Sequence, residues 1–403
     1  MKKIIFTGYI ITLLVLFLYS YTQIDLSLTF SRIDFLRELV KSFQYIGYFD
    51  RPLSALLYIF IIILLLSFYL CFIIMVLKKQ INKKTLWKLI IATTIITAFS
   101  YNAFSYDIFN YMLDAKILVH YHQNPYLHKA LDFPGDPMLS FMHWTHRTYP
   151  YGPIWLLLTT PLSFLGANLF IPTFFLFKTL MAASFLGTAY YIGKILQKIS
   201  PSHALLGVAF FSLNPLVIIE SLVSAHLDIV MIFFATFALY RLLNKKYISS
   251  FILLAISIGI KFMTAALLPV FLLIIILRQK NKKMHWDLIL SFALLFMTAT
   301  VIYASHLTNF QPWYLLDIIF LSSLLPYRFF IAIPFIIIPI FALFNDLPFL
   351  YLGNWNPPVP QLISEMNTFS YVVSLFSIVG YYFLNLPYAK NVSGKRKSAH
   401  PES

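Results

Sequence analysis

The sequence has few of the residues on which soluble and redox-active proteins depend. Cys71 is the only cysteine among 403 residues, which excludes an intrachain disulfide and any CxxC redox or metal site. Charged residues make up only 11% of the chain, whereas soluble domains carry about 25%. No Walker motif and no glycine-rich dinucleotide fingerprint is present, so the sequence offers no recognisable site for ATP or a dinucleotide cofactor.

Apolar side chains, in contrast, are abundant. Hydrophobic residues account for 60% of the sequence, and the mean hydropathy is +0.79. Apolar runs recur at lengths near the roughly 20 residues that cross a bilayer as a helix, without the alternating pattern of a membrane barrel. The sequence therefore predicts an all-α, polytopic transmembrane protein with about 10 to 13 membrane helices. We expect residues 1–389 to form one membrane domain.

The basic residues indicate how the chain is oriented. The net charge is +15 at pH 7, but the cations fall in short clusters between apolar runs, as from Lys78 to Lys84. The positive-inside rule places such clusters in the cytoplasm, so topology explains the charge better than nucleic-acid binding does. We expect a multi-pass protein of the cell membrane with both termini cytoplasmic, and a basic, disordered tail over residues 390–403.

A polar stretch from Ser105 to Pro153 interrupts the apolar sequence. On this topology it is a large loop on the outer face, carrying helices that lie beside the membrane. Asp107 and Asp114 are seven residues apart, which is two helical turns, so a helix over residues 106–119 would present both on one face. We interpret Asp107 as a general base, or alternatively as an acid favoured by the helix dipole, and Asp114 as a substrate-binding candidate.

An outer-face site has no supply of ATP or nucleotide sugar, so its donor must be reachable from the bilayer, as a lipid-linked phosphate is. Lys261, Arg147 and Arg328 are candidate ligands of that phosphate, although Arg147 could equally be an ordinary loop cation. Lys261 interrupts the apolar run over residues 248–277. This predicts two short helices with the lysine near their outer turn, the alternative being a snorkelling lysine in one tilted helix.

Other polar and aromatic residues suit sugar binding. His226 and Asp228 could bind a sugar or could hydrogen-bond to each other. The remaining candidates could contact sugars or belong to an interfacial aromatic belt; they are Asn124, Tyr126, Tyr149, Tyr151 and Trp313. The loop histidines match no strong zinc signature, so we assign no metal ligand and leave a divalent cation open as a cofactor. These histidines are His120, His122, His128, His143 and His146.

Five motifs in order resemble the GT-C class of membrane glycosyltransferases, specifically the polyprenol-phosphomannose-dependent alpha-mannopyranosyltransferases. The stretch from Ser105 to Tyr111 resembles that family's Asp-centred loop opening, and the stretch from Tyr149 to Pro153 resembles its Pro-Tyr-Gly-Pro closing. The others are Asn124-Pro125-Tyr126, the Asn214-Pro215-Leu216 helix leading to His226-Leu227-Asp228, and the Lys261 segment through Pro269. Leu227 departs from the family, which usually has Asn there.

The resemblance implies that Asp107 deprotonates an acceptor hydroxyl, which attacks the donor sugar with inversion, while Lys261 and arginines hold the phosphate. The implied activity is transfer of a hexose, above all mannose, from a polyprenyl-phosphate donor to a glycan or lipid acceptor at the outer face. The alternative is a transporter or flippase of lipid-linked sugars, although we see no internal repeat. A third interpretation keeps the fold with a pentose or oligosaccharide donor.

Overall fold

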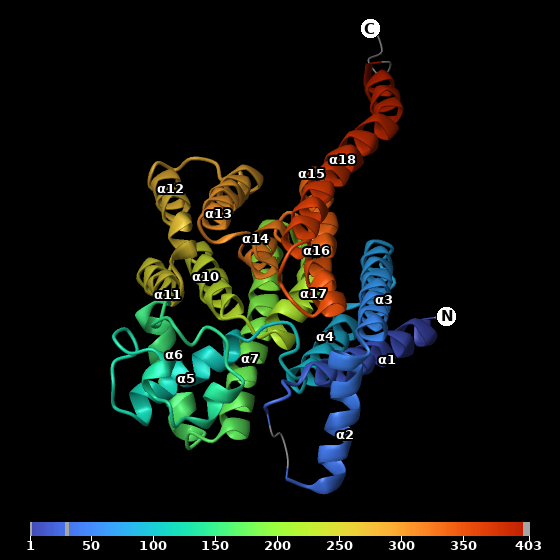
Figure 1. The fold of residues 1–403 in the computed structure, drawn as a ribbon. Coiled ribbons are helices and arrows are strands. Elements are labelled where there is room, and N and C mark those ends of the chain that lie inside the picture. Colours follow the sequence, from blue (N-terminus) through green and yellow to red (C-terminus); the bar gives the residue numbers. More distant parts are fainter. Residues whose placement is uncertain (1, 29–31, 398–403) are drawn as a thin grey trace, which may run out of the picture.

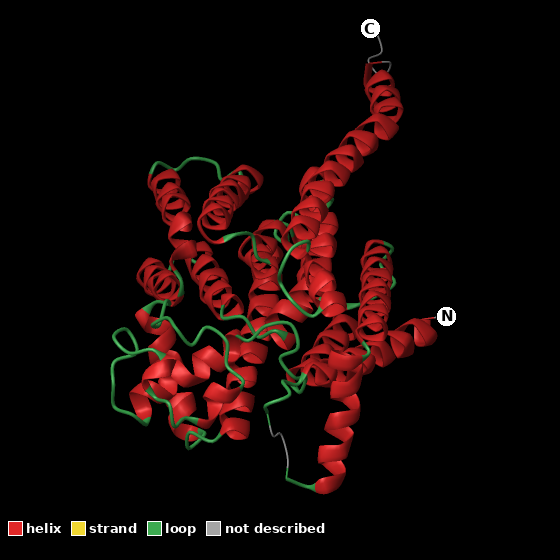
Figure 2. Ribbon diagram, viewed as in Figure 1, coloured by secondary structure: helices red, strands yellow, loops and turns green. Residues whose placement is uncertain are grey.

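The computed structural model describes residues 2–28 and 32–397, and within these residues the chain is helical without a strand (Figure 2). Seven helical segments are long and apolar enough to cross a membrane, and an eighth is added if one bent pair of helices counts as a span. Three further apolar segments are shorter, namely Pro153–Leu165, Tyr247–Ile260 and Pro312–Ser322. The all-α, polytopic fold is confirmed. Several apolar runs are divided into shorter helices.

Most of the helices follow one another with short connections, and the longest connection is the polar loop over residues 120–152 between α5 and α6. The long ones are α1 (Lys2–Ser20), α3 (Arg51–Leu77), α7 (Phe170–Ile199), α13 (Trp286–Thr308) and α18 (Val359–Lys397). Those of intermediate length are α2 (Asp34–Gln44), α4 (Lys83–Ala98), α5 (Asp107–Val119), α6 (Pro153–Leu165), α10 (Asp228–Leu243), α11 (Tyr247–Ile260) and α12 (Leu268–Gln279). The shortest are α8 (Ala204–Ser212), α9 (Pro215–Ile218), α14 (Leu316–Ser322), α15 (Phe329–Ala332), α16 (Pro334–Leu343) and α17 (Leu347–Leu352).

Two breaks in apolar runs shape the centre of the molecule. The apolar run over residues 204–223 bends by 57° between Ser212 and Pro215. Proline has no backbone N–H, and the Asn214 side chain caps the new helix by accepting from the backbone N–H of Leu216. The second break falls at Lys261, whose extended backbone separates α11 from α12. The predicted division into two helices is thus confirmed, and a single tilted helix is excluded.

The polar loop and the basic connections lie at opposite ends of the molecule. In Figure 1, α5 and α6 with their loops occupy the lower end together with α2, whereas the α12–α13 connection and the end of α18 lie at the top. The exposed α2 presents Phe35 at 74% exposure, as expected of a helix at a membrane surface. α18 continues to Lys397 and so includes residues 390–397 of the predicted tail. The rest of the predicted tail, residues 398–403, lies outside the described residues.

A buried lysine holds the end of the bent segment. Lys178, in the middle of α7, is 1% exposed, and its amine donates to the carbonyl oxygens of Leu222 and Val223. These carbonyls close the π-helical turn Ile219–Val223, which follows α9. A lysine in the interior of a membrane protein costs free energy. Here the cost is offset because the amine satisfies carbonyl groups that lack a helical partner.

Replacing Lys178 by Met is therefore expected to destabilise the protein. Each buried carbonyl left unpaired costs about 1–3 kcal/mol, and a lower thermal unfolding temperature in detergent would report the loss. Lys194→Met is the matched control, because Lys194 is on the same helix but lies over the ring of Tyr190. Equal unfolding temperatures for the two variants would contradict the capping role.

Candidate active site

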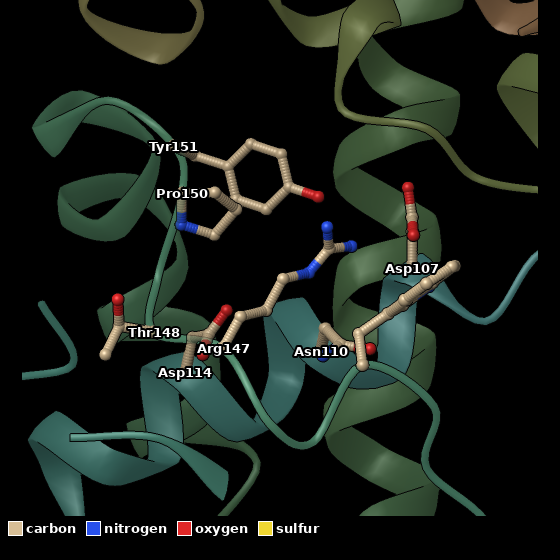
Figure 3. A pocket seen from close by; sticks show the side chains of 8 residues that line it. Asp107, Asn110, Asp114, Arg147, Thr148, Pro150 and Tyr151 are labelled. Carbon is tan, nitrogen blue, oxygen red and sulfur yellow. The ribbon is translucent and has the colours of Figure 1, made fainter. Parts of the chain in front are cut away.

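Helix α5 brings the two loop acids together, as their spacing predicts. The helix begins at Asp107, and Asp107, Asn110 and Asp114 lie one turn apart along one wall of a polar cleft (Figure 3). The opposite wall comes from the end of the loop. Its residues are Trp144, Arg147, Thr148, Pro150 and Tyr151. The Asp107 side chain keeps 14% of its surface exposed, so its carboxylate can be reached from the cleft.

Arg147 gives the cleft a fixed positive charge. Its guanidinium lies 4.5 Å from the centre of the Trp144 ring and points between Tyr151 and Asp107 (Figure 3). Burial raises the pKa of Asp114 to about 8, against the opposing effect of Arg147. Asp114 is therefore mainly protonated at neutral pH and can donate a hydrogen bond to a ligand, whereas a general base must be ionised.

His226 lies behind Asp107. Its Nε2 atom is 3.0 Å from Ser105 Oγ and 3.8 Å from Asp107 Oδ2. The ring stacks on Trp313 with centroids 4.1 Å apart. On the other side of Asp107, the hydroxyl of Tyr111 donates to Oδ2 over 3.4 Å. The structure thus brings three predicted residues, Asp107, His226 and Trp313, into one cluster.

Lys261 and Asp228 form an ion pair at this end of the membrane helices. The Lys261 Nζ atom lies 2.5 Å from Asp228 Oδ1, and the Asp228 side chain is 2% exposed while that of Lys261 is 21% exposed. The ammonium also lies 4.8 Å from the centre of the Tyr314 ring. Burial lowers the pKa of Lys261, but Asp228 and Asp317 outweigh that effect and raise it, so the ammonium is charged. Both carboxyl oxygens of Asp317 lack a hydrogen-bond partner among the described residues.

The closing segment of the loop packs directly against the Lys261 turn. The N–H of Gly152 donates to the carbonyl of Ile260 over 3.0 Å. A Cβ atom on Gly152 would lie 2.1 Å from the carbonyl oxygen of Gly259, so only glycine permits this approach of two backbones. The segment that carries Tyr151 is therefore fixed to the residues immediately before Lys261.

Other loop residues hold the loop in shape. Asn124 accepts from the N–H of Tyr126, which is a side-chain turn of the Asx type. The Tyr126 hydroxyl donates to the carbonyl of Tyr151 over 3.1 Å, and the N–H of Tyr149 donates to the carbonyl of Pro125. Of the predicted sugar-binding set, Tyr151 lines the cleft, whereas Tyr126 and Tyr149 tie the two halves of the loop together and Asn124 shapes the turn before Tyr126.

Arg328 is not brought to this site, contrary to the sequence-based expectation. It pairs with Asp287, in the first turn of α13, while the ring of the neighbouring Tyr327 contacts that of His203. The other end of α13 leads to Trp313, and 23 helical residues span about 35 Å. The bend that carries Arg328 thus lies at the opposite end of the membrane helices, where the basic connections are.

No group of three or more histidine, cysteine, aspartate or glutamate side chains is placed to hold a metal within residues 2–28 and 32–397. Several loop histidines contact their own neighbours instead. His143 stacks on Tyr106 with centroids 3.7 Å apart, and His128 lies 3.6 Å from Asp132.

Sequence reasoning missed Glu220, Asp317 and Lys178. Each is a charged residue in an apolar segment and each is at most 2% exposed. An ionisable residue in an apolar segment indicates a function or a specific partner. The sequence could therefore have identified these three positions, but it could not have identified the residues that they contact.

Comparison with known proteins identifies the family of this chain. The family model described as the N-terminal domain of alpha-(1->6)-mannopyranosyltransferases matches residues 28–277, which include α5, His226 and Lys261. The chain belongs to this mannosyltransferase family. It is also similar to alpha-(1->6)-mannopyranosyltransferase A of Corynebacterium glutamicum, with 27% identity over 151 residues. That match covers 36% of this chain and 30% of the relative. No solved structure matches. The family confirms the resemblance carried by the motifs between Ser105 and Pro269.

Proposed function

We propose that this chain transfers mannose from a polyprenyl-phosphate donor to a glycan or lipid acceptor at the outer face of the cell membrane, with inversion. The family match supports mannose as the transferred sugar. The observation that carries the rest is an accessible carboxylate, Asp107, in a polar cleft whose closing segment packs against the turn that leads to Lys261. This charged lysine immediately precedes an apolar span. A donor with a phosphate at the rim and a lipid tail between helices suits this arrangement.

The proposed reaction is a single displacement. Asp107 takes the proton of the acceptor hydroxyl, and the oxygen of that hydroxyl forms a bond to the anomeric carbon of mannose. The bond from that carbon to the phosphate oxygen breaks on the opposite side, and its electron pair leaves with the phosphate. Lys261 and Arg147 stabilise the charge that grows on the phosphate. To do so, Lys261 exchanges its contact with Asp228 for one with the donor.

The outer location rests on the distribution of charge. The loop with Asp107 and the basic α12–α13 connection lie at opposite ends of the molecule, and the positive-inside rule assigns the basic end to the cytoplasm. Both termini are then cytoplasmic. This orientation can be tested in intact cells with a cysteine-specific label that does not cross the membrane. We expect the label to attach to Ser140→Cys and not to Lys282→Cys.

A donor panel tests the activity. The protein purified in detergent is incubated with polyprenyl-phosphate mannose, glucose and arabinose in turn, together with a mannose-containing acceptor, and the products are identified by mass spectrometry. We expect product from the mannose donor and none from a nucleotide-linked mannose. Transfer only from the arabinose donor would establish a pentosyltransferase. Lipid-sugar movement across vesicles without any transfer in detergent would establish the transporter alternative.

The contact between Gly152 and Gly259 provides a further test. Gly152→Ala is expected to lower the transfer rate by about 10- to 100-fold, since displacements of about 1 Å at a catalytic site have effects of this size. The added Cβ would push Tyr151 and the Lys261 turn apart. Gly135→Ala is the matched control in the same loop, because a Cβ there would meet nothing within 4 Å. A Gly152→Ala variant with the rate of the control would show that the two segments need not be in contact.

A further inference from the structure

Glu220 is a buried acid in the bent segment that approaches the site. It lies in the π-helical turn Ile219–Val223 and is 2% exposed. Removing a carboxylate from water is expensive unless a charged or hydrogen-bonding partner is in place. Turns of this kind inside helices are also frequent at functional sites. The position of Glu220 therefore indicates that its carboxylate has a specific partner.

The partner of Glu220 is His226. The Oε2 atom of Glu220 lies 2.9 Å from His226 Nδ1, and the backbone N–H of His226 donates to the carbonyl of Glu220 over 3.0 Å. Trp313 stacks on the imidazole ring. With the ring fixed by these contacts, Nε2 has only one direction open to it, toward Ser105 Oγ and Asp107 Oδ2.

Charged groups on three elements face the imidazole. They are Glu220 on the π-helical turn, Asp107 on α5 and Asp228 on α10. Glu220 is in turn faced by Tyr58 of α3 and Asp346, just before α17. Burial lowers the pKa of His226, but the hydrogen bond and the charge of Glu220, followed by Asp107 and Asp228, raise it by more. The charged groups that raise the pKa of His226 are thus all acids.

We propose that Glu220 is a positioning residue that keeps His226 as an imidazolium facing Asp107, and through it keeps Asp107 ionised until the acceptor arrives. The inference rests on the proposed role of Asp107 as the base. In the imidazolium, Nδ1–H lies beside the Glu220 carboxylate, with Nδ1 2.9 Å from Oε2, and Nε2–H faces Ser105 and Asp107. Neutral His226 would instead turn a lone pair on Nε2 toward the Asp107 carboxylate. Glu220 thus acts on the reaction at a distance, without touching substrate.

Glu220→Gln removes the charge and leaves an oxygen that can accept from Nδ1. Activity requires protonated His226, so kcat/KM falls as pH rises through the pKa of His226. Loss of the Glu220 charge lowers that pKa, and we expect the alkaline limb of the profile to move down by about 1 to 3 pH units. The acid limb stays in place, because His226 remains protonated there. Glu220→Asp keeps the charge and should restore part of the alkaline limb. Ser221→Ala, a neighbour on the same turn, is the control.

The outcomes separate this inference from the proposed function. A Glu220→Gln profile that is lowered equally at every pH would overturn the inference and leave Glu220 as a structural group. If Asp107→Asn keeps full activity, the base assignment fails, whatever Glu220 does. A readout independent of transfer is the NMR titration of the His226 imidazole in protein labelled at histidine, assigned by its absence in His226→Gln. The pH at the midpoint of this titration should be lower in Glu220→Gln than in the wild type. An unchanged midpoint would overturn the inference, and this test does not require a transfer assay.

Discussion

Asp107→Asn is expected to lower kcat for mannose transfer by about 10²- to 10⁴-fold, which is the usual contribution of a general base. The asparagine side chain has nearly the same shape as aspartate but cannot take a proton from the acceptor hydroxyl. The variant should fold normally, because the N–H of residue 107 still donates to Ser105 Oγ and the hydroxyl of Tyr111 still finds an acceptor. Single-turnover transfer from radiolabelled donor measures the chemical step directly.

Asp132→Asn is the matched control for that experiment. Asp132 is also an acid of the loop, but its contacts are with the backbone of Lys129 and the ring of His128. It should transfer mannose at the wild-type rate. Wild-type single-turnover kinetics in Asp107→Asn would show that Asp107 is not the general base and would contradict the proposed reaction.

Lys261→Met should have the second large effect, on donor affinity and on stability together. Loss of the ammonium removes the main charge that the donor phosphate would meet, and we expect Kd for the donor to rise by about 100-fold or more, equivalent to about 2.7 kcal/mol. The same change leaves Asp228 and Asp317 as buried acids without their cation. Breaking a buried pair in this way typically destabilises a protein by about 3–5 kcal/mol.

The double variant Lys261→Met with Asp228→Asn separates the two effects. It neutralises the acid that the single variant leaves unpaired, so most of the thermal stability should return. Donor binding, measured by equilibrium binding of radiolabelled polyprenyl-phosphate mannose, should stay weak. Donor affinity that returns together with stability would show that Lys261 serves the fold and does not bind the phosphate.

Local patterns in the sequence predicted the parts of the site that depend on one segment only. The spacing of Asp107 and Asp114 placed both on one face of α5, because helical periodicity is a property of a short stretch. The break at Lys261 followed from the cost of a lysine in an apolar run. In both cases the physical cause acts within about 10 residues of the feature.

Features that depend on packing between distant segments could not be predicted from the sequence. Arg328 was assigned to the site by its charge, but which end of the membrane helices a residue occupies depends on every span before it. The contact of His226 with Ser105 joins residues 121 positions apart. Similarly, the sequence shows Glu220 as an acid within an apolar segment, but it does not show the partner. That partner is His226, against which the π-helical turn places Glu220.

The close approach of Gly152 to Gly259 has a consequence for how the two substrates communicate. In the proposed reaction Lys261 contacts the donor phosphate, and the residues just before Lys261 are in direct backbone contact with Gly152. Tyr151, the neighbour of Gly152, lines the cleft where the acceptor would bind. A shift of Lys261 on binding the donor would therefore also displace Tyr151, so that donor binding would change the shape of the acceptor side of the cleft.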